Sequence, residues 1–221
     1  DLIACIGAIN IDRSYKCLKP YIMGDSNSAT LNKSIGGVMF NIFSTLMLLS
    51  CKAKLISFIG DDPESIIIKK KLLQFGSDSS YILEINNEKT GSYTVIQDKC
   101  GETIIAVNDM SILEKVKPSF IGKVINNINA NTWVIDSNFD QESFEKIISL
   151  IKDKKIIGTA VSSIKVKRLR PVLKYLDCLF LNKSELFALI PEEKSIRKAI
   201  DRILALGTKK IFVTLGENGA I

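Results

Sequence analysis

The sequence contains no histidine and few cysteines. Without histidine, Ser-His-Asp and Cys-His triads are excluded, and any proton transfer must use carboxylates, lysine or water. The cysteines are odd in number and show no C-x-x-C spacing, which argues against a cysteine zinc site. We therefore expect reduced thiols in a cytoplasmic protein. The cysteines are Cys5, Cys17, Cys51, Cys100 and Cys178.

The sequence also lacks an apolar run suited to a membrane span. The uncharged stretch from Ile35 to Cys51 is shorter than the ~20 residues that a bilayer core requires, and it contains Asn41. We expect a buried helix here and no membrane partner.

Clustered positive charge is scarce as well. The formal net charge is +6, but the lysines are spread among acidic residues. The one dense basic run, residues 165–170 (KVKRLR), contains no aromatic side chain that could stack on a base. We interpret this run as the solvated face of a helix and expect no nucleic-acid partner.

The chain does contain short apolar runs that end in Gly, Asp or Asn and alternate with segments of helical spacing. This alternation is typical of βαβ units, and it predicts one α/β domain built on a parallel sheet. The expected strands lie in residues 2–9, 53–60, 133–136, 155–158, 178–181 and 210–216, and the expected helices are Glu64–Phe75, Gln141–Lys152 and Glu192–Leu206.

Two segments interrupt this alternation, at about residues 14–33 and 90–109. In the second, β-rich runs flank Asp98-Lys99-Cys100-Gly101, where the glycine can adopt the positive φ of a hairpin turn. Open α/β sheets bind ligands at the carboxyl ends of their strands. We therefore expect the inserted β-structure to form a small lid beside that edge.

Polar residues and glycines follow the first predicted strand. Asn10 and Asp12 lie where the chain leaves the sheet, and a carboxylate there can accept two hydrogen bonds from a vicinal diol. Gly36 and Gly37 allow close approach of a ligand, and Asn41 lies on the first turns of the following helix. The alternatives are structural: Asp12 as a turn former or helix cap, the glycines as a simple turn, and Asn41 as a satisfied buried amide.

Two further patterns follow late strands. Asn182 and Glu185 share one face of a helix start, where an amide and a carboxylate can order a hydrated magnesium ion, although the same spacing forms an ordinary capping box. Thr214, Gly216 and Gly219 end the chain in a glycine turn after a strand. Such a turn suits the phosphates of a nucleotide, although many such turns only connect elements.

The order of these patterns carries more information than any one of them. N-x-D at 10–12, G-G-x-x-x-N at 36–41, N-x-x-E at 182–185 and V-T-L-G-x-x-G at 213–219 together resemble the ribokinase-like (PfkB) family of carbohydrate and nucleoside kinases. Within this family the chain is most similar to pseudouridine kinases, at residues 90–110, 135–138 and 165–173. The resemblance covers residues 1–221 and implies a three-layer α/β fold, a mostly parallel sheet flanked by helices, with a small β-lid.

The resemblance also implies roles for single residues. Asp12 would hold sugar hydroxyls in a substrate pocket, and a late group of residues would hold ATP and Mg²⁺. The implied substrate-binding residues are Asn10, Asp12, Gly36, Gly37, Asn41 and Asn138; the implied ATP-binding residues are Asn182, Thr214, Gly216 and Gly219; the implied metal residue is Glu185.

Three departures from the family pattern are visible. The family's catalytic G-A-G-D motif has no counterpart before Ile221, so we expect its aspartate beyond this residue and a C-terminally incomplete domain that is silent alone. Phe40 replaces a residue that is usually basic in pseudouridine kinases, and Thr159 replaces an aspartate at a strand end.

The implied activity is ATP- and magnesium-dependent phosphorylation of the 5′-hydroxyl of a ribosyl nucleoside, with pseudouridine as first candidate. The alternatives are another sugar or nucleoside, or a noncatalytic ligand-binding or scaffold protein that kept the fold. Besides the small-molecule substrate, the resemblance suggests two partners, a fused or coupled pseudouridine-5′-phosphate glycosidase and a second copy of the chain contacting the lid.

Overall fold

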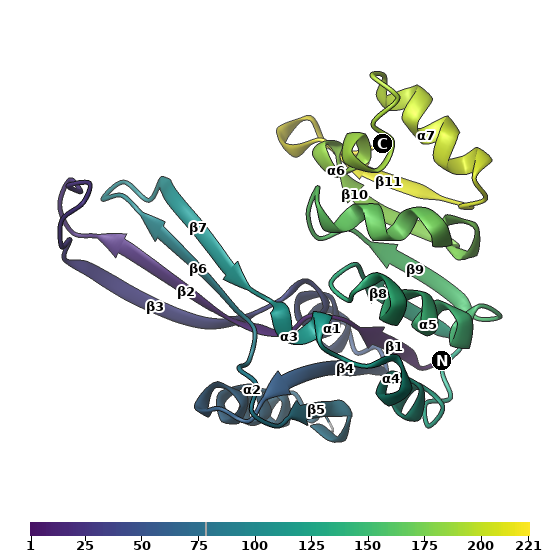
Figure 1. Cartoon of the computed structure of the whole chain (residues 1–221), viewed down its shortest axis with the longest axis horizontal. Helices are drawn as coiled ribbons and strands as arrows, with labels where there is room; N and C mark the ends of the chain where they lie inside the picture. The colour runs from purple at the N-terminus through teal and green to yellow at the C-terminus, as the bar shows by residue number, and fades with distance from the viewer. Residues whose placement is uncertain (78) are drawn as a thin grey trace.

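The computed structural model describes residues 1–77 and 79–221. Its body is a seven-stranded sheet in which every pairing is parallel, with the order β11-β10-β9-β8-β1-β4-β5 (Figure 1). All six predicted strand regions belong to it, and the prediction of a parallel α/β sheet is confirmed. The strands are β1 (Ile3–Ile6), β4 (Ala53–Gly60), β5 (Ile82–Ile85), β8 (Thr132–Asp136), β9 (Lys155–Thr159), β10 (Cys178–Asn182) and β11 (Ile211–Thr214).

Helices cover both faces of this sheet and complete three layers. Strand β1 is buried on both faces, as parallel strands usually are: Ala4 and Ile6 face one core, and Cys5 faces the other. The helices are α1 (Val38–Leu48), α2 (Pro63–Gln74), α3 (Ser111–Glu114), α4 (Pro118–Ile125), α5 (Gln141–Ile151), α6 (Lys183–Leu189) and α7 (Ile196–Ala205), with 3₁₀ helices η1 (Ser79–Tyr81), η2 (Lys165–Tyr175) and η3 (Gly216–Asn218).

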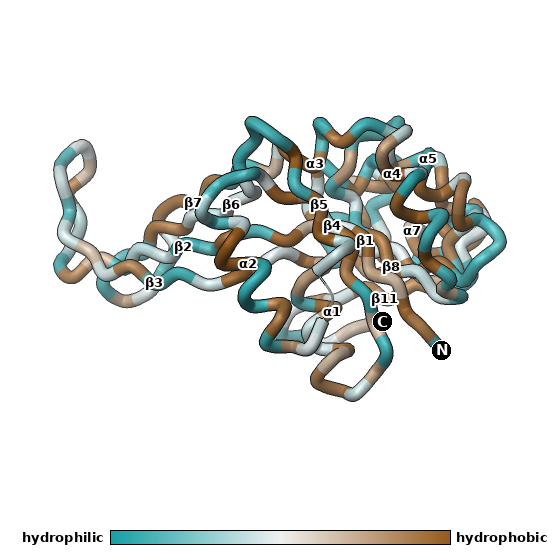
Figure 2. The backbone as a smooth tube through the Cα atoms, turned by 90° about the horizontal axis from the view of Figure 1, so that it is seen from below, coloured by the Kyte–Doolittle hydropathy of each residue, from teal (hydrophilic) through white to brown (hydrophobic). Residues whose placement is uncertain are grey.

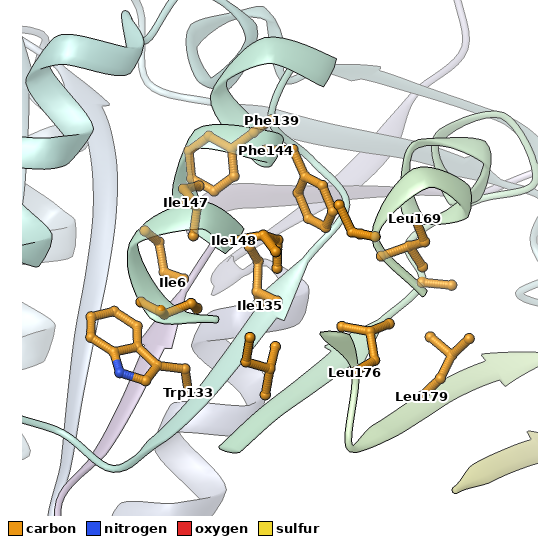
Figure 3. Close-up of a cluster of buried hydrophobic side chains, with 14 of the residues drawn as sticks. Ile6, Trp133, Ile135, Phe139, Phe144, Ile147, Ile148, Leu169, Leu176 and Leu179 are labelled. Atoms are coloured by element: carbon orange, nitrogen blue, oxygen red, sulfur yellow. The ribbon is translucent and has the colours of Figure 1, made fainter. Parts of the chain in front are cut away.

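The larger core lies between the sheet and the α5 side of the molecule (Figure 3). Trp133 is buried there, and its indole Nε1 donates to the carbonyl of Ala130 at 3.1 Å, so the ring is buried without an unsatisfied donor. Phe139 packs edge-on against Phe58, with ring centroids 6.0 Å apart. The helical periodicity of α5 brings Phe144, Ile147, Ile148 and Ile151 onto this core.

The two interrupting segments form a separate four-stranded sheet, the lid sheet, with order β3-β2-β6-β7. Figures 1 and 2 show it extending away from the body. Strand β2 begins four residues earlier than the predicted segment, at Asn10. The predicted turn is confirmed, because Gly101 has φ 96° and Asp98 Oδ1 accepts from the Cys100 N–H at 2.8 Å. The lid strands are β2 (Asn10–Cys17), β3 (Ala29–Gly36), β6 (Ser92–Gln97) and β7 (Thr103–Asp109).

Helix α1 is shorter and less buried than the sequence predicts. It begins after Gly37, and only Met39, Phe40 and Phe43 are buried, while Leu48 is 76% exposed. The prediction of a buried helix therefore holds for one face only. No helix among the described residues is long and apolar enough to cross a membrane.

The predicted helix from Glu192 is wrong at its start. Residues 191–195 form turns and coil, and helix α7 begins at Ile196. Glu192 instead pairs with Arg170 at 2.8 Å. The other two predicted helices match α2 and α5 within one residue at each end.

Candidate functional site

A cavity of about 560 Å³ lies where the lid sheet meets the body. It is bounded by the start of β2, the start of α1, the β7–α3 connection, the loop after β8 and the region around the start of η2. The structure brings five of the six predicted substrate residues to its lining: Asn10, Asp12, Gly37, Asn41 and Asn138.

Asp12 supplies a carboxylate to this cavity. Its Oδ1 accepts a hydrogen bond from Asn10 Nδ2 at 2.6 Å, and the Asn10 side chain is itself buried. Burial raises the pKa of Asp12, and the hydrogen bond from Asn10 partly opposes this. Because Asp12 lies inside strand β2, it neither forms a turn nor caps a helix.

The glycine pair lets the start of α1 pack closely on this site. Gly36 pairs with Asn10 across β2 and β3, and a Cβ atom at Gly36 would overlap the Asp12 carboxylate. Gly37 has φ 104°, and a Cβ there would overlap the carbonyl oxygen of Ala8. That carbonyl accepts from the Phe40 N–H at 3.2 Å, so it anchors the first turn of the helix.

Residues 40 and 41 lie on different sides of helix α1. Asn41 is exposed and lines the cavity. This position explains why a mostly apolar run contains an amide side chain. Phe40 is 5% exposed and packs edge-on against Phe75, with ring centroids 6.2 Å apart. Phe40 therefore belongs to the core and does not line this cavity.

Asp136 is a buried residue that links two loops beneath the site. Its Oδ2 accepts from the Ala8 N–H at 2.8 Å, and its Oδ1 accepts from the Asn138 N–H at 3.0 Å. Burial raises its pKa, although these two hydrogen bonds favour the carboxylate. A Cβ at Gly7 would overlap the carboxyl group, so glycine is needed at this contact.

The basic run at 165–170 is not a solvated face throughout, and that prediction is wrong for two of its residues. Lys165 and Arg168 lie three apart on η2, so they share a side of this 3₁₀ helix, and both line the cavity. Lys165 Nζ donates to Asn138 Oδ1 at 2.9 Å. The spacing of three, which places two residues on one side of an α-helix or a 3₁₀ helix, was the only signal in the sequence.

Arg168 holds the loop that carries Asn138. Its Nη1 donates to the carbonyl oxygens of Ser137, Asn138 and Phe139 at 3.3, 2.8 and 2.6 Å, and its Nη2 donates to Glu114 at 2.7 Å. Its side chain is only 22% exposed. If the guanidinium were removed, water would replace these hydrogen bonds only in part. The guanidinium is thus a structural support for one wall of the cavity.

We expect Arg168→Met to lower the free energy of unfolding by about 1–3 kcal/mol, because it leaves partly buried carbonyls without their donor. The matched change Arg197→Met removes an 87% exposed side chain on α7, and we expect it to stay within about 0.5 kcal/mol. Urea denaturation of both variants measures the difference. Equal midpoints for the two variants would show that Arg168 supports nothing.

The predicted nucleotide residues come together elsewhere, at the ends of β10 and β11. Asn182 and Thr214 are neighbours in the parallel register of these strands. Gly216 and Gly219 have φ values of 64° and 79°, and a Cβ at either would meet no atom within 4 Å, so their backbone is open to approach. These residues do not line the 560 Å³ cavity.

Asn182 and Glu185 form the capping box that was the structural alternative. Asn182 Oδ1 accepts from the Glu185 N–H at 2.9 Å, and Glu185 Oε2 accepts from the Asn182 N–H at 2.8 Å. Within the described part of the chain, no group of three or more His, Cys, Asp or Glu side chains could hold a metal by itself. An Mg²⁺ ion here would have to keep most of its water ligands, as this ion commonly does.

Curated relatives match nearly the whole chain at low identity. An uncharacterized sugar kinase, YeiI, of Escherichia coli is 25% identical over 95% of this chain and 59% of its own length. A pseudouridine kinase of the same organism is 27% identical over 99% of this chain and 72% of its own length. A pseudouridine-metabolizing bifunctional protein of Schizosaccharomyces pombe is 27% identical over 87% of this chain and 26% of its own length. The chain thus spans 59% and 72% of the lengths of the first two relatives.

Solved structures share the fold. Arabidopsis thaliana ribokinase, in a structure described as complexed with ribose and ATP, superposes with a TM-score of 0.79 at 20% identity, over 99% of this chain and 73% of that one. The model of the pfkB family of carbohydrate kinases matches residues 1–221. The family match, the parallel sheet with its lid and the order of the motifs agree, and the chain belongs to the pfkB family of carbohydrate kinases.

Proposed function

We propose that the protein is an ATP- and Mg²⁺-dependent kinase for the 5′-hydroxyl of a ribosyl nucleoside, with pseudouridine as first candidate. The observation that carries this proposal is the Asp12 carboxylate, which is oriented by Asn10 and lines a cavity at the base of the lid. A carboxylate so placed suits a vicinal diol of ribose. The E. coli pseudouridine kinase, at 27% identity, supports the choice of nucleoside.

In this reaction the residues of the chain bind the nucleoside and the nucleotide and orient them. Asp12 accepts hydrogen bonds from two ribose hydroxyls, while Asn41 and Asn138 contact the substrate from two other walls. The open backbone at Gly216 and Gly219 suits a nucleotide, in keeping with the ATP named for the Arabidopsis ribokinase structure. Phosphoryl transfer depends mainly on such positioning and on charge stabilisation.

Asn182 and Thr214 extend the proposed nucleotide side, and Glu185 would hold Mg²⁺ through water. When bound, this ion would neutralise charge on the phosphates. The 221 residues contain no G-A-G-D sequence, so the base that the family resemblance implies has no counterpart among them. We therefore propose that these residues alone bind nucleoside without transferring phosphoryl.

The proposal is tested with the product of the complete gene, assayed with ATP and Mg²⁺ against pseudouridine, ribose, adenosine and fructose 6-phosphate. We expect turnover to be highest with pseudouridine, and none with the 221-residue chain alone. If the complete product phosphorylates none of these compounds but still binds nucleoside, the noncatalytic alternative replaces the proposal. Turnover by the 221 residues alone would contradict the assignment of the missing base.

Two partners belong to the same proposal. The S. pombe relative is a bifunctional pseudouridine-metabolizing protein, which supports a functional link with a pseudouridine-5′-phosphate glycosidase. The lid sheet exposes the apolar side chains of Leu31, Ile105 and Val107, each more than half accessible. Such a surface supports a contact with a second copy through the lid.

A further inference from the structure

The wall of the cavity formed by η2 and the loop after β8 differs chemically from the wall that carries Asp12. Lys165 and Asn138 lie there, and their side chains are joined by a 2.9 Å hydrogen bond between Nζ and Oδ1. The Lys165 side chain is 16% exposed and that of Asn138 is buried, so both are held by the protein rather than by solvent.

This hydrogen bond fixes how the Asn138 amide is turned. An ammonium group can only donate, so the amide oxygen must face Lys165. The amide NH₂ also interacts with the Asp136 carboxylate, so only part of its donor capacity is left for a ligand. Lys165 has three N–H donors, of which this bond uses one. The acidic group of this wall, Glu114, is already bound by Arg168 at 2.7 Å and lies 4.0 Å from Lys165 Nζ. The wall therefore offers a ligand mainly donors.

Lys165 and Arg168 have different roles in this wall of the cavity. Arg168 uses its guanidinium on three backbone carbonyls and on Glu114, so it has few donors left for a ligand. Lys165 is held by fewer contacts, and its backbone N–H is fixed by Ser162 Oγ at 3.2 Å. Burial lowers the pKa of Lys165 and the neighbouring Arg168 charge adds to this, while the carboxylates of Glu114 and Asp136 oppose the shift.

We propose that Lys165 and Asn138 recognise carbonyl oxygens of the substrate's ring and so select a uracil-type base over an amino-bearing base or a bare sugar. This inference rests on the proposed function, since it assumes that Asp12 holds the ribose on the opposite side of the same cavity. A ligand with hydroxyls at one end and carbonyl oxygens at the other complements an acceptor wall and a donor wall. A ring amino group facing Lys165 would instead set donor against donor.

The test is calorimetric binding of pseudouridine, pseudoisocytidine and ribose to the full chain. Pseudoisocytidine keeps the C-glycosidic bond and replaces one ring carbonyl by an amino group. We expect wild-type protein to bind pseudouridine at least about tenfold more tightly than either other ligand, as charged hydrogen bonds commonly provide. This comparison needs no variant.

Substitutions show which side chain causes the preference for pseudouridine. Lys165→Met should weaken pseudouridine binding about tenfold or more and change ribose binding less than about twofold. Lys165→Arg, which keeps donors, should retain most of the preference. Lys167→Met removes an exposed lysine of the same helix that does not line the cavity. This variant should bind both ligands with unchanged affinity.

The outcomes separate the two proposals. Binding of ribose without any gain for pseudouridine, or an equal loss for all ligands in Lys165→Met, overturns the inference and leaves the kinase proposal standing. Failure of wild-type protein to bind any of the three ligands overturns the proposed function and this inference with it. If Lys165→Met does not fold, the wild-type protein still tests the inference. A preference for pseudouridine over pseudoisocytidine supports it, and equal affinities overturn it.

Discussion

Replacing Asp12 by Asn is expected to weaken nucleoside binding by about 1.5–3 kcal/mol, which is about 10- to 150-fold, and to leave ATP affinity nearly unchanged. The change removes the charge that accepts two ribose hydroxyls but keeps the size of the side chain. The ATP side is unaffected because Thr214 and the glycine turn after it lie at other strand ends. Calorimetry with each ligand separately measures both effects.

The control for this change is Asp153→Asn, which alters an exposed aspartate in the turn between α5 and β9. It should leave both affinities unchanged. Burial raises the pKa of Asp12, so wild-type binding should begin to weaken, as pH falls, at a higher pH than for an exposed aspartate. The Asp12→Asn variant should lack that dependence. Unaltered nucleoside affinity in this variant would mean that Asp12 does not touch the sugar.

The largest loss of stability is expected from Gly37→Ala. At φ 104° an L-residue is strained, which alone costs about 1–3 kcal/mol. The new methyl group would also overlap the carbonyl oxygen of Ala8, which is backbone and cannot rotate away. Either the start of α1 moves or the Ala8 contact breaks, and both displace the lining of the cavity. Urea denaturation should show a lower midpoint, and nucleoside binding should fall with it.

The same substitution at Gly122 serves as the control. Gly122 lies inside helix α4 with ordinary φ, and a Cβ there would meet Leu150 and Lys146 only at 3.9 Å. Alanine should therefore be neutral or stabilise by about 0.4–1 kcal/mol, because it restricts the unfolded chain. A Gly37→Ala protein as stable as Gly122→Ala would show that the tight contact with Ala8 relaxes without cost.

The sequence predicted the parts of the fold that depend on local pattern. Apolar runs ending in Gly, Asp or Asn located the strands of the parallel sheet, and Gly101 located the lid hairpin. Five predicted substrate residues line one cavity because carboxyl ends of neighbouring parallel strands, and the loops after them, share one edge of the sheet. Their roles remain predictions that the binding experiments above will decide.

The parts that could not be predicted depend on contacts between distant segments. Nothing local to Arg168 indicates that it reaches the carbonyls of residues 137–139. Asp136 likewise binds the Ala8 N–H, which follows the neighbouring strand β1 but lies 128 residues earlier in the chain. Glu192 lies before the start of α7 and forms ion pairs with Arg170 on η2 and with Arg202 on α7, at 2.8 and 4.0 Å. Tertiary hydrogen bonds and ion pairs decide these cases.

The parallel pairing of β2 with β6 also sets the order in which the lid can assemble during synthesis. Strand β2 pairs with nearby β3 as a hairpin, but its other edge pairs Ile11 with Ser92 and Lys16 with Gln97. Until β6 has left the ribosome, that edge of the nascent chain has no partner in its own lid, and an open edge invites pairing with other chains. Lys16 is exposed on β2 and carries positive charge during this interval, and a charge on an open edge disfavours pairing with other chains.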